Sequence, residues 1–279
     1  METRRLGDSD LMVSVVGMGG NNFSRPKTAS ETQEGSVAVI QAAIDAGITF
    51  IDGADIYGTP PGTSEEFIAE AIKGRRDQVV LSTKFGFQGV DMYPDQDLGP
   101  KGGERYIRYA VEQSLRRLQT DRIDLLQMHS PDPDTPIAET LRVLTDLVAE
   151  GKVRHVGNSN FTAEQLVAAD EAARANGFVR FVSAQNGYSL IEREAETELL
   201  PTAERLGLGF FPYYPLFNGL LTGKYTQGIG EGRLSKIKPQ LLETTDWDRL
   251  KAYQQLCDEA GFTMLQATFS WMAAQAPIA

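Results

Sequence analysis

The sequence predicts an α/β fold, a closed (β/α)8 TIM barrel, and three observations lead to this class. Short apolar runs alternate with segments of helical period along the chain. The runs are apolar almost throughout, as expected for parallel strands covered on both faces. Polar residues gather at the carboxyl ends of the runs. An open doubly wound sheet also alternates, but only a closed barrel brings the ends of six strands together at one rim.

Seven strand and seven helix segments are predicted, after a short hairpin at residues 4–14. The strands are expected at 14–19, 48–52, 79–84, 124–129, 153–159, 181–185 and 208–213. The helices are expected at 31–46, 64–72, 104–118, 136–150, 163–176 and 194–206, followed by one long helix from about Trp247. No linker or low-complexity segment interrupts the pattern, so residues 1–279 are expected to form a single domain.

Local signals support several helix boundaries. Thr162 with Gln165 and Thr63 with Glu66 have the spacing of capping boxes. Pro136 is expected at the first helical position of its helix. Glycines 151 and 177 follow helical segments, where helix C-caps are expected.

Charge and cysteine content exclude several classes of function. The net charge is −11 and the isoelectric point is about 4.8, so neither nucleic acid nor an anionic membrane is an expected partner. The single cysteine, Cys257, is typical of a reducing compartment, and a cytoplasmic protein is expected. No apolar stretch is long enough to span a membrane. With two histidines and no ligand spacing, no metal site is expected.

Each polar residue at a strand end has an ordinary structural interpretation, but together they suggest a site. These residues are Asp52, Lys84, His129, Ser159 with Asn160, Gln185 and Tyr213. Alone, Asp52 is as well explained by turn capping, and His129 by burial with satisfied hydrogen bonds. Six such residues at one rim would require six independent coincidences.

Tyr57 follows Asp52 by five residues and suggests acid catalysis. A cation at about 4 Å contributes on the order of 4 kcal/mol at a dielectric of 20. We therefore expect Lys84 to lower the pKa of Tyr57 by up to about 3 units, with Asp52 holding Lys84. Such a phenol can exchange a proton with a carbonyl–alcohol pair, and His129 can orient the same oxygen. A hydride must then come from a cofactor.

Six segments, in the same order, resemble those of the aldo-keto reductase superfamily, from one end of the chain to the other. They are GITFIDGADIYG (47–58), VVLSTKFG (79–86), DLLQMHSPDPDTP (124–136), VRHVGNSNF (153–161), AQNGYSL (184–190) and YYPLFNGLLTGKY (213–225). The resemblance implies a (β/α)8 barrel that binds NADP(H), with NAD(H) left open as the alternative.

The resemblance also assigns roles to residues. Asp52, Tyr57, Lys84 and His129 correspond to the catalytic tetrad, with Tyr57 as the general acid. Ser159, Asn160 and Gln185 correspond to the groups that bind the nicotinamide carboxamide, and Tyr213 to the residue that stacks on its ring. The other implied cofactor contacts are Gly19, Tyr214, Leu216, Gly219, Leu221, Gly223 and Lys224. The loop from 216 to 224 is expected to wrap the pyrophosphate.

Two of the four departures from the family pattern bear on the fold. Gly53 stands where threonine is usual, so the turn that carries Tyr57 is expected to be looser. The sequence ends at 275–279, where the eighth strand is expected to begin. We therefore expect the natural protein to continue with that strand and the following helix.

The function that follows is NADPH-dependent reduction of an aldehyde or ketone. The alternative that the resemblance implies is a cofactor-binding regulatory subunit of the potassium-channel β-subunit type, which shares the fold, tetrad and cofactor and serves as a partner protein. Four rim aromatics, Phe23, Phe85, Phe87 and Tyr93, are expected either to line an apolar substrate pocket or to pack the loops. The particular carbonyl substrate and the oligomeric state stay open.

Overall fold

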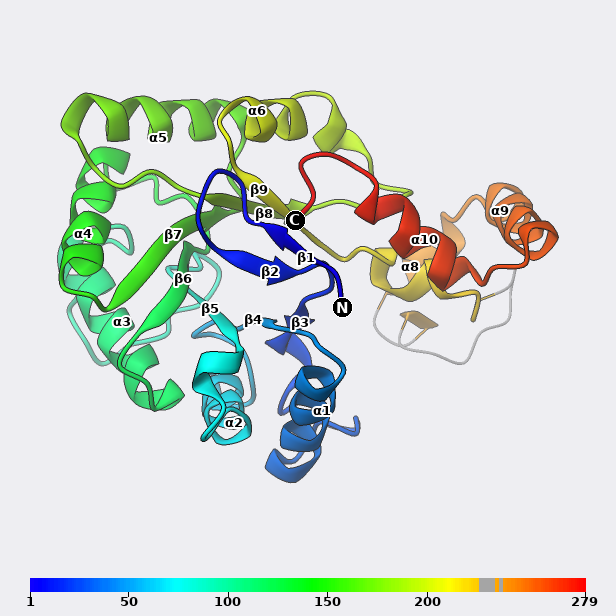
Figure 1. Ribbon diagram of the computed structural model, residues 1–279, viewed down its shortest axis with the longest axis horizontal. Coiled ribbons are helices and arrows are strands. Elements are labelled where there is room, and N and C mark those ends of the chain that lie inside the picture. Colours follow the sequence, from blue (N-terminus) through cyan, green and yellow to red (C-terminus); the bar gives the residue numbers. More distant parts are fainter. Residues whose placement is uncertain (226–233, 236–237) are drawn as a thin grey trace.

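Seven parallel strands form one curved sheet in the computed structural model, which describes residues 1–225, 234–235 and 238–279 (Figure 1). They are β3 (Met18–Gly19), β4 (Phe50–Asp52), β5 (Val80–Phe85), β6 (Ile123–Met128), β7 (Val153–Ser159), β8 (Ser183–Gly187) and β9 (Gly209–Tyr213). Their order in the sheet is their order in the sequence, and every neighbouring pair is parallel. The predicted barrel class is confirmed.

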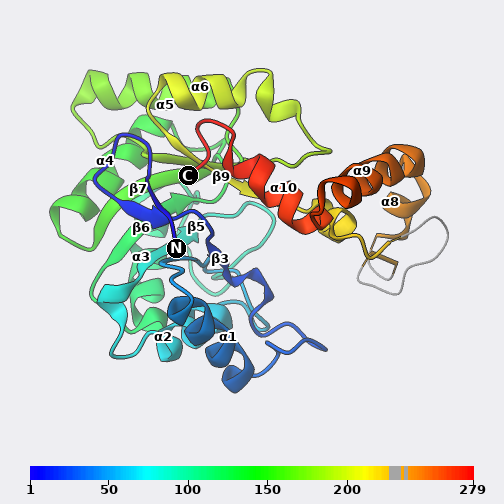
Figure 2. The same ribbon diagram turned by 45° about the vertical axis from the view of Figure 1, so that its right-hand side comes forward.

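Six helices follow the strands and cover the outer face of the sheet (Figures 1 and 2). They are α1 (Gln33–Asp45), α2 (Thr63–Ala71), α3 (Glu104–Leu118), α4 (Ile137–Ala149), α5 (Ala163–Asn176) and α6 (Leu199–Arg205). Short 3-10 turns lie at η1 (Gly20–Asn22), η2 (Arg76–Gln78), η3 (Glu194–Glu196) and η4 (Phe217–Thr222). Among the described residues that follow η4, the helices α8 (Pro239–Glu243), α9 (Trp247–Ala260) and α10 (Met264–Ala273) project to one side.

The final helical segment is two helices, so the prediction of one long helix was wrong. Gly261 ends α9 with a φ of +74°, a conformation that glycine adopts without strain. Thr263 then starts α10 with a capping box to Gln266. The glycine ends one helix and the threonine cap begins the next, whereas the hydrophobic pattern alone does not show the break.

The other boundary signals gave mixed results. The Thr162–Gln165 capping box forms, and Gly177 caps α5 in the left-handed conformation, as predicted. The Thr63–Glu66 box does not form, because Gly62 is the N-cap and the Thr63 hydroxyl donates to the Pro60 carbonyl instead. Pro136 is the N-cap of α4 and not its first helical residue.

An N-terminal hairpin closes the barrel at the amino ends of the strands. Its strands are β1 (Thr3–Arg5) and β2 (Met12–Ser14), which shortens the first barrel strand from the predicted start at Ser14. Leu6, Leu11 and Val13 of the hairpin are buried in one cluster with Phe50, Leu125 and Phe211. The Phe50 and Phe211 rings stack at 4.5 Å within this apolar floor.

Successive residues near the carboxyl ends of the strands face opposite sides of the sheet, with apolar side chains towards the helices and polar side chains towards the barrel interior. Leu126, Ala184 and Phe210 belong to the apolar cluster between the sheet and the helices. Their neighbours Gln127 and Gln185 reach instead towards Asp52 inside the barrel. This alternation follows from the two-residue period of a strand, and it places polar side chains above the apolar floor.

The last residues lie beside β9. Ile278 forms a parallel bridge with Phe210, and the Ala279 amide donates to the Phe210 carbonyl at 3.1 Å. This is the position at which the eighth strand was expected to begin. Within the described parts of the chain, no helix has the length and apolar character needed to cross a membrane.

A buried polar cluster lies on the outer side of the β4–β5 edge, beneath the turn that carries Tyr57. Glu65 of α2 is fully buried and accepts hydrogen bonds from Thr83 at 2.5 Å and from Arg117 at 2.7 Å. Asp55 is also fully buried, and neither of its carboxyl oxygens has a hydrogen-bond partner among the described residues. Burial, reinforced by repulsion from Glu65, raises the pKa of Asp55 to about 7.

Replacing Asp55 with asparagine should change stability in a pH-dependent way. The ordinary pKa of the carboxyl is 3.8, so the folded protein holds its proton to a higher pH than the unfolded chain. The stability contributed by the protonated form is present at low pH and lost as the pH rises through about 7. The free energy of unfolding of Asp55→Asn minus that of the parent should rise by about 2–3 kcal/mol from pH 5 to pH 8. Urea unfolding at the two pH values measures it.

Asp95→Asn provides the control, because Asp95 is an exposed carboxyl in the loop after β5. Its difference from the parent should be the same at both pH values. A pH-independent difference for Asp55→Asn would mean that the buried carboxyl ionises as an ordinary one does.

Candidate active site

The Asp52 carboxylate is the centre of the polar layer inside the barrel. Lys84 Nζ donates to Asp52 Oδ2 at 2.7 Å and to the Gly53 carbonyl at 2.8 Å. The Lys84 side chain is fully buried. Burial alone would lower the pKa of Lys84, but attraction to Asp52 and Tyr57 outweighs it and raises the pKa. Lys84 therefore stays cationic inside the barrel.

Three uncharged side chains complete the hydrogen bonds of Asp52. Gln127 Nε2 and Ser82 Oγ donate to Oδ1 at 3.0 and 3.3 Å, and Gln185 Nε2 donates to Oδ2 at 3.2 Å. Ser82 and Gln127 are not among the site residues predicted from the sequence. Each lies two positions before a predicted rim residue, Lys84 or His129, and therefore on the same face of its strand. That spacing was the available signal.

The turn that carries Tyr57 is held by backbone hydrogen bonds. The Gly53 amide donates to the Ser82 carbonyl at 2.8 Å, and the Asp55 amide donates to the Lys84 carbonyl at 3.2 Å. The Tyr57 amide donates to the Ala54 carbonyl at 3.1 Å. A Cβ atom at Gly53 would lie 3.3 Å from the Ser82 carbonyl oxygen, so the turn packs closely against β5. The structure thus shows a hydrogen-bonded turn at Gly53, and the looser turn expected for a glycine at this position stays a prediction.

Tyr57 lies beside Lys84 and His129, but its pKa moves opposite to the prediction. Lys84 Nζ is 5.2 Å from the centre of the Tyr57 ring. The Tyr57 and His129 rings meet edge to face at 6.0 Å. Burial raises the pKa of Tyr57, and although Lys84 lowers it, burial and Asp52 together outweigh that effect. The phenol therefore keeps its proton at neutral pH.

His129 is neutral in this site. Burial, together with repulsion from Lys84, lowers the pKa of His129 to about 3. Its Nδ1 atom is buried without a hydrogen-bond partner among the described residues. Because the ring lines the cavity, Nε2 is the nitrogen that can meet a ligand there.

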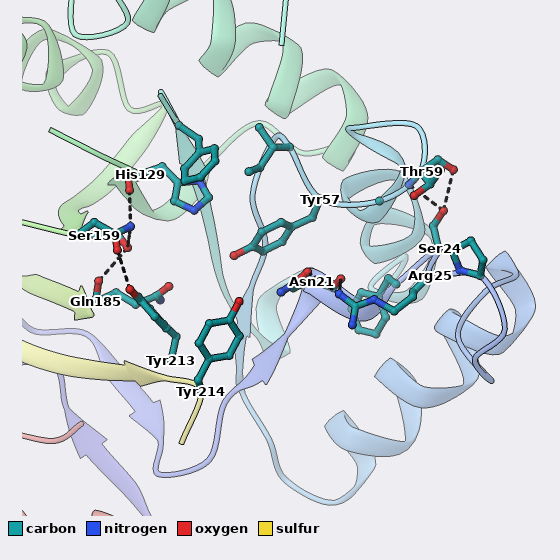
Figure 3. A pocket seen from close by; sticks show the side chains of 16 residues that line it. Asn21, Ser24, Arg25, Tyr57, Thr59, His129, Ser159, Gln185, Tyr213 and Tyr214 are labelled. Atoms are coloured by element: carbon teal, nitrogen blue, oxygen red, sulfur yellow. Dashed lines mark hydrogen bonds between the residues drawn. The ribbon is translucent and has the colours of Figure 1, made fainter. Parts of the chain in front are cut away.

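An amide-bearing wall faces Tyr57 across the cavity (Figure 3). Asn160 Nδ2 donates to the His129 carbonyl at 2.9 Å, and the Tyr213 hydroxyl donates to Asn160 Oδ1 at 2.8 Å. Ser159 Oγ donates to the Gln185 carbonyl at 2.8 Å. Asn160 has a φ of +62°, which asparagine tolerates better than most residues. These bonds tie the ends of β6, β7, β8 and β9 into one rigid wall.

The cavity itself has a volume of about 590 Å³, within the usual range for small-molecule sites. Its predicted members are Tyr57, His129, Ser159, Asn160, Gln185, Tyr213 and Tyr214. Asp52 and Lys84 lie behind Tyr57 without lining the cavity. Gly19, Leu216, Gly219, Leu221, Gly223 and Lys224 do not line it either.

Residues after β3 and β4 form the opposite wall, and sequence reasoning missed most of them. They are Asn21, Ser24, Arg25, Pro26, Ile56, Gly58 and Thr59. Of the four aromatics considered, Phe23 and Phe87 line the cavity. Phe85 is buried beneath the helices, and Tyr93 packs on Tyr106 and Tyr109, so these two are packing residues.

The amide wall has hydrogen-bonding capacity left for a cofactor amide. Gln185 lines the cavity, and within the described part of the chain its Oε1 accepts no hydrogen bond. The segment after β9 offers backbone suited to close approach, since Gly219 and Gly223 have φ values of +100° and +76°. The side chains of Leu220 and Leu221 are buried in local clusters, which fixes this segment in place. Both regions fit the groups expected to hold a dinucleotide.

In residues 1–225, 234–235 and 238–279, no three histidine, cysteine or acidic side chains gather as metal ligands would.

Comparison with known proteins agrees with this geometry. The chain is 37% identical over 283 residues to the uncharacterized oxidoreductase YrpG of Bacillus subtilis, covering 98% of this chain and 84% of that protein. It is 39% identical over 229 residues to the aldo-keto reductase YhdN of the same organism, covering 81% and 66%. It is 31% identical over 286 residues to the L-glyceraldehyde 3-phosphate reductase of Escherichia coli K12, covering 98% and 80%.

A family-wide comparison covers nearly the whole chain. The sequence profile of the Aldo/keto reductase family matches residues 15–279. The chain therefore belongs to the aldo/keto reductase family and is an oxidoreductase of that family.

Proposed function

We propose that the protein reduces an aldehyde or ketone to the alcohol with NADPH, and that Tyr57 donates the proton. The observation that carries this proposal is the arrangement around one cavity. A half-buried phenol and a neutral imidazole face the cavity together, and the Asp52–Lys84 ion pair lies directly behind the phenol.

In this proposal the two rings divide the work on the carbonyl oxygen. Tyr57 is the proton donor, and its raised pKa keeps the proton in place until the oxygen gains charge. Lys84 then stabilises the phenolate that remains, because it is cationic and lies 5.2 Å from the ring centre. His129 orients the oxygen through Nε2 without competing for the proton, since its imidazole is neutral.

The amide wall is the proposed nicotinamide site. Ser159, Asn160 and Gln185 would hold the carboxamide, and Tyr213 would pack against the ring. The segment 216–224 would hold the pyrophosphate, with Gly219 and Gly223 allowing close backbone approach. The cofactor supplies the hydride that no side chain provides. The choice of NADPH over NADH rests on the family resemblance, so both cofactors belong in the assay.

Replacing Tyr57 with phenylalanine tests the role of the phenol. We expect NADPH to bind Tyr57→Phe as it binds the parent, because the ring and its packing remain. The rate of carbonyl reduction should fall about 10²- to 10⁴-fold, the usual contribution of a positioned acid. NADPH oxidation with a panel of aldehydes, ketones and keto-sugars measures the rate, and fluorescence titration measures cofactor binding.

Tyr109→Phe is the matched control, because it removes a phenol hydroxyl from α3, outside the cavity. It should retain the parental rate. A Tyr57→Phe variant as active as Tyr109→Phe would refute the assigned role of Tyr57.

The pH profile tests the neutral imidazole. With the pKa of His129 at about 3 and that of Tyr57 above its ordinary value, neither ring titrates between pH 5 and 9. Asp55, with a pKa of about 7, is two residues from Tyr57, so its titration is best removed by Asp55→Asn. In that variant kcat/KM should be level from pH 5 to 9, and a step near pH 6.5 would show that His129 titrates normally.

A further inference from the structure

The imidazole of His129 is oriented by packing and not by a hydrogen bond at its inner nitrogen. His129 Nδ1 has no hydrogen-bond partner among the described residues. A catalytic imidazole is usually oriented through the nitrogen that does not meet the ligand. Here the contacts are aromatic, with the Tyr57 ring centre 6.0 Å and the Phe87 ring centre 4.9 Å from that of His129.

Phe87 lies in the loop after β5 and lines the cavity. A Cβ atom added at Gly89 would lie 2.6 Å from Phe87 Cε1, so the ring also packs against the backbone of its own loop. The conformation of this loop therefore determines where the Phe87 ring contacts His129.

Lys101, at the far end of the same loop, holds the turn that carries Phe87. Its Nζ atom donates to the Phe87 carbonyl at 2.6 Å and to the Val90 carbonyl at 2.6 Å. Hydrogen bonds from an ammonium group are shorter and stronger than those between neutral groups. A Cβ atom at Gly86 would lie 3.7 Å from Lys101 Cβ, so the two ends of the loop also meet.

The Lys101 end of the loop is fixed to the segment that follows His129. The Gly102 amide donates to Asp132 Oδ2. The Thr140 hydroxyl of α4 donates to the Gly102 carbonyl at 2.8 Å. Lys101 therefore ties the turn after β5 to the β6–α4 connection, in which the imidazole itself lies.

We propose that Lys101 is a positioning residue: by binding the Phe87–Val90 turn, it holds Phe87 against His129 and fixes the imidazole that orients the carbonyl oxygen. The inference rests on the proposed carbonyl reduction, in which His129 Nε2 meets that oxygen. It adds to the reaction a residue that does not itself line the cavity.

Replacing Lys101 with methionine tests this role, because methionine keeps an unbranched stem and removes the ammonium donor. We expect kcat to fall about 10- to 100-fold with a smaller change in KM, since a small misplacement of a catalytic group has a large effect on rate. Lys101→Arg, which keeps the donors and the charge, should recover most of kcat. NADPH affinity, measured by fluorescence titration, should stay as in the parent. An unchanged kcat in Lys101→Met would contradict the proposal.

The assay pH removes one other route by which Lys101 could act. Lys101 is among the charges that act on Asp55, whose pKa burial raises to about 7. The rates are therefore compared at pH 5, where the Asp55 carboxyl is protonated in parent and variant alike.

A double-mutant cycle shows whether Lys101 acts through Phe87. Phe87→Ala removes the ring that contacts His129, so adding Lys101→Met should lower kcat by less than about 2-fold more. A merely structural lysine would lower kcat by the same factor with and without the ring, and that result would overturn the proposal. Lys73→Met is the matched control, because Lys73 is exposed and follows α2, and it should keep the parental kcat.

Nuclear magnetic resonance of His129 separates this inference from the proposed function. The protein has two histidines, and His155, which meets Asp10 Oδ1 at 2.8 Å and does not line the cavity, is the internal reference. The Phe87 ring current shifts the His129 signals. In Lys101→Met these signals should move towards their positions in Phe87→Ala, while those of His155 stay in place.

If no aldehyde is consumed with either cofactor, the proposed reduction fails and the spectra alone decide whether Lys101 positions the imidazole. His129 signals that are identical in Lys101→Met and the parent would refute the inference.

Discussion

The buried ion pair between Asp52 and Lys84 is the constraint on which the interior of this barrel depends. Two charges removed from water are costly unless every remaining hydrogen bond is made. Here Ser82, Gln127 and Gln185 from three strands all donate to the carboxylate. The polar layer is therefore a support for the pair, and the apolar floor formed with the hairpin keeps water from the other end. The same layer sets the place of the phenol and imidazole above it.

Much of the fold was predictable because strand and helix periods are local properties. Each strand end also showed its polar residue directly, since a charged or amide side chain is conspicuous after an apolar run. The supporting residues Ser82 and Gln127 were not found, because small or neutral side chains within a strand look ordinary until its inward face is known. The cavity wall around Arg25 was missed for a different reason. Loop residues have no period, and their place depends on contacts such as Ser24 with Thr59.

The neighbours predicted for Tyr57 from the sequence were correct, but the predicted direction of its pKa shift was wrong. The expectation counted the cation and omitted the cost of burying a phenolate. Distance between groups can be inferred from a motif, whereas burial depends on the whole barrel. The neutral state of His129 has the same origin, because burial and Lys84 act together on it. Protonation states in such a site are properties of the assembled fold.

The hydrogen bond from Gln185 to Asp52 joins residues 133 positions apart. Closing so long a loop costs more chain entropy than closing the 32-residue separation between Asp52 and Lys84. The aspartate and lysine need only β4 and β5 to be paired, whereas the amide wall also needs the ends of β6 to β9. Recovery of catalysis during refolding would consequently report completion of the whole polar layer and not the pairing of β4 with β5 alone.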